Sequence, residues 1–69
     1  MATINNESAY ILPVSSQEAI RNALAAIGIS EVSAKFAYAN GDVPIFDIED
    51  MEKNYLFSLD ASDDSIFDK

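Results

Sequence analysis

Residues 31–49 read EVSAKFAYANGDVPIFDIE, and apolar side chains in this stretch alternate with polar or small ones on both sides of Asn40 and Gly41. Alternation with a period of two is typical of a half-buried strand, and an Asn-Gly pair supplies the left-handed backbone that tight hairpins need. We therefore predict an antiparallel hairpin over residues 31–49. The alternative is a helix over residues 31–39 capped by Ser30, because the alanines of that segment permit one.

The length of the hairpin loop decides which side chains share a face of the sheet. A two-residue loop in a regular hairpin would turn Phe46 and Ile48 away from the face of Val32. A three-residue loop over residues 39–41, with Gly41 in the left-handed conformation, avoids this loss. It gathers seven residues on one face: Val32, Ala34, Phe36, Tyr38, Pro44, Phe46 and Ile48. We predict the three-residue loop, and an edge position or an outward-facing nitrogen for the strand that contains Pro44.

An amphipathic helix is predicted over residues 16–27, ahead of the hairpin. Ser15 is the expected N-cap, Glu18 follows three residues later in a capping-box arrangement, and Gly28 ends the helix. Apolar side chains recur at three- and four-residue spacing, namely Ala19, Ile20, Ala23, Leu24 and Ile27. They form one stripe that can pack on a sheet.

The segment after residue 49 fits two patterns. The alternation of Tyr55, Phe57 and Leu59 predicts a third strand over about residues 55–59. A helix is the alternative, because apolar side chains also lie close to one helical face, namely Ile48, Met51, Tyr55 and Leu59. We predict the strand, followed by a polar turn at residues 60–65 and a return of residues 66–67 over exposed apolar surface. The predicted fold is an α+β domain, one helix on a small antiparallel sheet, that includes all of residues 1–69, with residues 1–8 flexible.

Composition excludes several classes of function. The chain has 69 residues, and none is Cys, His or Trp. Without Cys and His, zinc sites of the Cys/His kind and Ser-His-Asp or Cys-His catalysis are excluded, so we expect neither an enzyme nor a cofactor. The longest apolar run, residues 23–29, is far shorter than the roughly 20 residues that span a bilayer, so we expect a soluble protein. An apolar fraction of 49% predicts folding rather than disorder.

The charge is acidic and unevenly distributed. Twelve acidic side chains stand against four basic ones, which gives a net charge of −8. Nine of the acids and two of the lysines lie in residues 42–69, so that half carries −7. A folded domain that keeps such repulsion does so for solubility or for a basic partner, and direct binding to nucleic acid or to an anionic membrane is disfavoured.

Carboxylates near the hairpin are the candidate binding residues. In the predicted register Glu31 lies opposite Glu49, and like charges at such a pair oppose strand pairing. We therefore predict a partner-binding surface. Its main residues are Glu31, Asp47, Glu49, Asp50 and Glu52, with Asp60, Asp63 and Asp64 as a secondary group. The alternative is a solvated face that only keeps the protein soluble.

The spacing of strand residues suggests what such a surface could imitate. Alternate side chains on a strand lie about 6.8 Å apart, and every second phosphate along one DNA strand has about the same axial spacing. A row of carboxylates can therefore resemble a row of phosphates. A calcium site at residues 60–68 is not predicted, because the glycine and the closing glutamate of an EF-hand loop are missing.

In size, acidity and lack of catalytic residues, the chain resembles the small phage-encoded anti-CRISPR proteins, several of which mimic DNA. The resemblance covers the whole chain in character but involves no shared motif, and restriction-inhibiting DNA mimics would look the same. It implies a monomeric inhibitor in the bacterial cytoplasm that occupies the basic DNA-binding site of a Cas effector. The alternative is an accessory or antitoxin-like module that binds through Tyr38, Tyr55 and Phe57.

Overall fold

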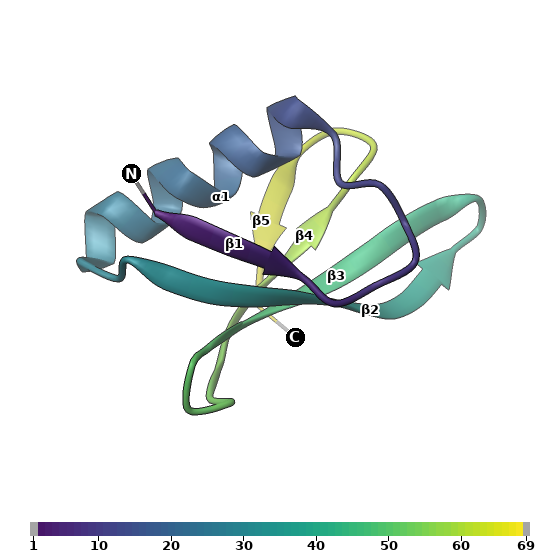
Figure 1. Ribbon diagram of the computed structural model, residues 1–69. Coiled ribbons are helices and arrows are strands. Elements are labelled where there is room, and N and C mark those ends of the chain that lie inside the picture. The colour runs from purple at the N-terminus through teal and green to yellow at the C-terminus, as the bar shows by residue number, and fades with distance from the viewer. Residues whose placement is uncertain (1, 69) are drawn as a thin grey trace.

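The computed structural model describes residues 2–68, in which a single helix lies on one face of a five-stranded sheet (Figure 1). The elements are β1 (Thr3–Asn6), α1 (Val14–Ile27), β2 (Glu31–Asn40), β3 (Val43–Asp50), β4 (Tyr55–Asp60) and β5 (Ser65–Phe67). The strands follow one another across the sheet in chain order. Strand β1 runs parallel to β2, and the other neighbours are antiparallel. The predicted α+β class is confirmed, but the sheet is mixed and has two strands more than predicted.

Strand β1 lies within residues 1–8, which were expected to be flexible. Its four residues, TINN, include one large apolar side chain, Ile4, which packs against the core. Main-chain pairing with residues 31–34 of β2 makes this segment a strand, and α1 forms the crossover that a parallel pair requires. The pairing continues to Glu7, whose N–H donates to the carbonyl oxygen of Ala34 at 2.8 Å. Residue 1, also expected to be flexible, lies outside the described residues.

The hairpin is confirmed, but its predicted three-residue loop is wrong. The chain turns at Gly41 and Asp42, and Asn40 pairs with Val43. Ala37 is an extra residue in β2, because the register shifts between Phe36 and Tyr38. This β-bulge absorbs one residue, so a two-residue loop does not turn the apolar side chains of β3 away from the core.

The bulge divides the predicted apolar face. Before it, Ala34 pairs with Ile48 and Phe36 pairs with Phe46, so these side chains share the core face as predicted. Beyond it, Tyr38 pairs with Ile45 and lies on the opposite face. The left-handed conformation predicted for Gly41 is present, with φ at 64°.

The position of Pro44 differs from the predicted edge. Strand β3 is the central strand of the sheet. Its pairing with β4 begins at Ile45, one residue after Pro44. The missing N–H of the proline therefore does not interrupt the ladder between β3 and β4.

Helix α1 begins earlier than predicted and has no capping box. Pro13 is the N-cap, no side chain caps the helix, and the Pro13 carbonyl accepts the first helical bond from Gln17 N–H at 3.0 Å. Ser15 is therefore inside the first turn, where its hydroxyl cannot cap the helix. The predicted end is confirmed: Gly28 is left-handed, with φ at 73°, and its N–H donates to the Leu24 carbonyl.

The core lies between α1 and one face of the sheet. It includes Leu12, Ile20 and Leu24, Val32 and Ala34 of β2, Phe46 and Ile48 of β3, and Phe57 and Leu59 of β4. The predicted third strand is confirmed as β4. The predicted return of residues 66–67 takes the form of β5, which pairs with β4. The other face of the sheet carries the polar side chains of β2 and β3 and is described next.

Candidate functional site

The two strand carboxylates of the predicted surface are buried. Asp47 is 5% exposed and Glu49 is 9% exposed, although both were expected to face solvent. The Ser58 hydroxyl donates to Asp47 Oδ1 at 3.0 Å, and the hydroxyls of Ser58 and Tyr55 are 2.7 Å apart. Neighbouring polar groups on β4 therefore hold Asp47. The expected row of exposed carboxylates at phosphate spacing is not present along β3.

Glu49 does not face a like charge. The observed register places Ser33 opposite Glu49, while Glu31 pairs with Thr3 in β1. Lys35, one row further along β2, brings its Nζ to 3.0 Å from Glu49 Oε2. The predicted opposition of Glu31 and Glu49 is therefore wrong, and Glu49 is part of an ion pair across the two strands.

Asp50 shapes the turn between β3 and β4. Its Oδ1 accepts hydrogen bonds from the backbone N–H groups of Glu52 at 2.8 Å and Asn54 at 2.9 Å, and its Oδ2 accepts one from Asn54 Nδ2 at 3.2 Å. The pKa of Asp50 is lowered from its ordinary value, mainly by the hydrogen bond from the Asn54 backbone N–H. The carboxylate is thus both fixed in position and kept ionised.

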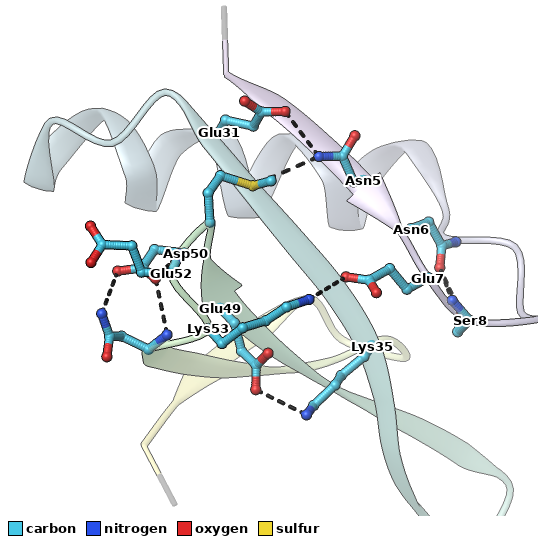
Figure 2. A network of polar contacts seen from close by, with 12 residues as sticks. Asn5, Asn6, Glu7, Ser8, Glu31, Lys35, Glu49, Asp50, Glu52 and Lys53 are labelled. Atoms are coloured by element: carbon cyan, nitrogen blue, oxygen red, sulfur yellow. Dashed lines mark hydrogen bonds and ion pairs between the residues drawn. The ribbon is translucent and has the colours of Figure 1, made fainter.

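Four of the predicted residues lie in one region at this end of the sheet. Figure 2 shows them in separate contacts: Glu31 with Asn5, Glu49 with Lys35, and Asp50 with the turn that contains Glu52, beside the pair of Lys53 and Glu7. Asn5 Nδ2 donates to Glu31 Oε2 at 3.1 Å, and Lys53 Nζ lies 3.6 Å from Glu7 Oε2. We call the five carboxylates, Glu7, Glu31, Glu49, Asp50 and Glu52, the acidic network. With two lysines among them, the network has a formal excess of three negative charges.

The secondary group lies at the other end of β4. Asp60 Oδ1 accepts from the Ser62 backbone N–H at 2.9 Å, which is the main cause of a lowered pKa for Asp60, and from the Ser62 hydroxyl at 2.8 Å. Asp64 accepts a hydrogen bond from the buried Ser16 hydroxyl of α1. Strand β4 has six residues, roughly 17 Å in length, so the structure does not join the two groups into one surface.

Within residues 2–68, no group of three or more acidic side chains is arranged to hold a metal ion. In the same part of the chain, no helix has the length and apolarity needed to cross a membrane. A groove of about 670 Å³ lies beside α1, and Arg21 Nε donates across it to the Ala2 carbonyl at 3.0 Å. None of the predicted binding residues lines this groove.

The aromatic residues named for the alternative function do not form one surface. Phe57 is a core residue, while Tyr38 and Tyr55 are exposed. The clearest exposed aromatic contact was not predicted: the rings of Tyr10 and Phe36 stack with centroids 4.8 Å apart. The signal in the sequence was a charge-free segment, residues 8–17, with an aromatic and two aliphatic residues in a row. Comparisons with protein-family models, curated proteins and solved structures found no match.

Proposed function

We propose that the protein is a non-enzymatic inhibitor that mimics DNA and blocks the nucleic-acid-binding site of a bacterial defence complex, a CRISPR-Cas effector. The observation that carries this proposal is the acidic network, in which five carboxylates lie in one region with only two lysines. Its partner would be a basic protein, and neither nucleic acid nor a membrane would be bound directly. The protein would act as a monomer in the bacterial cytoplasm.

A DNA mimic needs negative charges that are fixed and ionised, because a charge that moves or takes up a proton binds a basic site less well. Asp50 meets both conditions through its hydrogen bonds at the turn. Glu52, beside it, is exposed, and Glu31 is oriented by Asn5. These three carboxylates, rather than buried Asp47, would make the main contacts, and Asp60, Asp63 and Asp64 would add a second point of attraction.

A second candidate is an accessory or antitoxin-like interaction module. It is favoured by the exposed stack of Tyr10 and Phe36, since aromatic side chains are common binding anchors. In that case, acidity would only keep the protein soluble. The two functions differ in their dependence on salt, because ionic contacts are screened and apolar contacts are not.

The test compares two double variants that remove the same charge. Glu31→Gln with Glu52→Gln changes the acidic network, and Asp42→Asn with Asp68→Asn changes two exposed acids outside it. Each is added to purified Cas effectors, and DNA loading is followed by gel shift between about 50 and 200 mM salt. We expect the network variant to lose inhibition and the control to keep it.

Equal losses would mean that total charge, not the network, matters. If neither the unchanged protein nor any variant reduced DNA loading in any effector, the proposed target would be wrong. Inhibition that persists at high salt and is lost with Tyr10→Ala would favour the second candidate.

A further inference from the structure

The segment that leads into α1 exposes apolar side chains that the fold does not bury. Ile11 is 91% exposed, Val14 is 70% exposed and Tyr10 is 47% exposed. The Tyr10 ring stacks on exposed Phe36 and meets buried Phe46 edge-on, with centroids 6.3 Å apart. We call Tyr10, Ile11, Val14 and Phe36 the apolar surface. Tyr10 and Ile11 are adjacent in the chain and Val14 follows three residues later, and exposed apolar patches are typical of binding sites.

The main chain of this segment is held in place. Asn6 Nδ2 donates to the Tyr10 carbonyl at 2.8 Å, and the Tyr10 N–H donates to the Ser8 hydroxyl at 3.2 Å. Leu12 is buried in the core, and its carbonyl accepts from Gln17 Nε2 at 2.9 Å. The segment is therefore ordered before any partner binds, which lowers the entropy lost on association.

The charges around the apolar surface indicate the kind of partner. Residues 8–17 and 36–41 carry no charged side chain, although the chain has twelve acids. Exposed Glu7 and Glu18 flank the first of these segments. Glu7 lies 3.6 Å from Lys53, but an exposed pair at that distance is weak. An apolar surface on a chain with a net charge of −8 matches a partner with an apolar recess and basic surroundings.

We propose that the apolar surface docks into an apolar recess, rimmed by lysine or arginine, on a basic partner protein. Ile11 is the most exposed of the four and would enter the recess, and the stacked rings of Tyr10 and Phe36 would cover its margin. The basic character of the partner rests on the proposed function. A second copy of this chain is a poor occupant, because both copies carry a net charge of −8.

The probe is a short amphipathic peptide of leucine and lysine, which combines an apolar stripe with positive charge. A matched peptide replaces leucine by serine and keeps every lysine. Binding to the full chain is measured by fluorescence anisotropy at about 150 mM salt, where the Debye length is roughly 8 Å, and is mapped by amide chemical shifts. We expect the leucine peptide to bind more tightly and to shift the amides of Tyr10, Ile11, Leu12, Val14 and Phe36.

The decisive variants are Ile11→Asn and its matched control, Ile27→Asn. Both side chains are exposed, so neither change should unfold the protein, which circular dichroism checks. Ile11→Asn should weaken the leucine peptide about tenfold, as expected for a binding anchor, and the control should not. Equal losses in the two variants, or shifts confined to other faces, would overturn the docking site.

The two peptides separate this inference from the proposed function. If the serine peptide binds and leucine adds no affinity, the docking site fails while attraction to basic partners stands. If the leucine peptide binds as expected but the serine peptide fails to bind even at about 50 mM salt, the docking site stands while the electrostatic attraction behind the proposed function fails. Sedimentation that shows a dimer of the unchanged protein and a monomer of Ile11→Asn would mean that a second copy covers the surface, against the proposal.

Discussion

The hydroxyl of Ser16, in the first turn of α1, donates a hydrogen bond to the Asp64 carboxylate in the turn between β4 and β5. Ser16 is fully buried, and Asp64 has a left-handed backbone with φ at 58°. The contact joins residues 48 positions apart in the chain. It fixes the start of the helix against the last hairpin of the sheet and gives the turn acids a structural role.

Removing this contact should destabilise the fold. Ser16→Ala leaves a partly buried carboxylate without its donor, and the free energy of unfolding should fall by about 1–3 kcal/mol. Ser15→Ala, at an exposed neighbour, should change it by less than about 0.5 kcal/mol. Urea denaturation measures both variants. Similar values for the two would show that the contact with Asp64 contributes nothing.

Two glycines should be sensitive for reasons of backbone alone. Gly41 and Gly28 both have positive φ, and a Cβ added at either would meet no atom within 4 Å. Gly28→Ala should therefore cost about 1 kcal/mol, and Gly41→Val about 1–2 kcal/mol or more, because a β-branched side chain fits the left-handed region worse. Urea melts give the ranking. A loss smaller for Gly41→Val than for Gly28→Ala would contradict the left-handed turn.

These features also show how far the sequence could predict the fold. The helix end at Gly28 and the hairpin around Gly41 were predictable, because the glycines and the alternation of residues 31–49 act locally. The bulge at Ala37 could not be predicted, because the choice of loop length assumed that side chains alternate regularly throughout β2. Strand β1 was missed because its stability comes from pairing with residues far along the chain rather than from its own composition.

The candidate site was predictable in part for a similar reason. The predicted hairpin indicated that Glu31, at its start, would lie near Asp50 and Glu52, which follow its end, although the register assumed for Glu31 and Glu49 is wrong. The burial of Asp47 and Glu49 was not predicted. One face of the sheet was expected to pack on the helix and the other, which carries these two side chains, to face water. Asp47 and Glu49 instead meet hydroxyl and ammonium groups from the neighbouring strands.

Acid should affect stability through the two turn aspartates. The pKa values of Asp50 and Asp60 are lowered in the folded state by backbone N–H donors. A lowered folded pKa contributes stability above the unfolded value and loses it as pH falls through the folded value. The free energy of unfolding should therefore decline below about pH 3.8, the ordinary value for both groups.

Urea melts across the pH range, with Asp50→Asn and Asp60→Asn as comparison, measure this decline. Each variant keeps a carbonyl oxygen as an acceptor but cannot titrate, so the decline below pH 3.8 should become shallower. An unchanged decline in the double variant would assign the acid sensitivity to other groups.

Glu49 and Glu52 lie three residues apart in the acidic network but should respond differently to loss of charge. Glu49 is nearly buried and pairs with Lys35 Nζ at 3.0 Å, whereas Glu52 is exposed. Glu49→Gln should lower the free energy of unfolding by about 1–2 kcal/mol, less than for a fully buried ion pair because Lys35 is half exposed. Glu52→Gln should change it by less than about 0.5 kcal/mol. A double-mutant cycle with Lys35→Met isolates the pair, since the Glu49 substitution should cost less once the ammonium group is gone. If Glu49→Gln and Glu52→Gln were equally harmless, and the cycle showed no coupling, Glu49 would be as available to a partner as Glu52, and its assignment to the fold would be wrong.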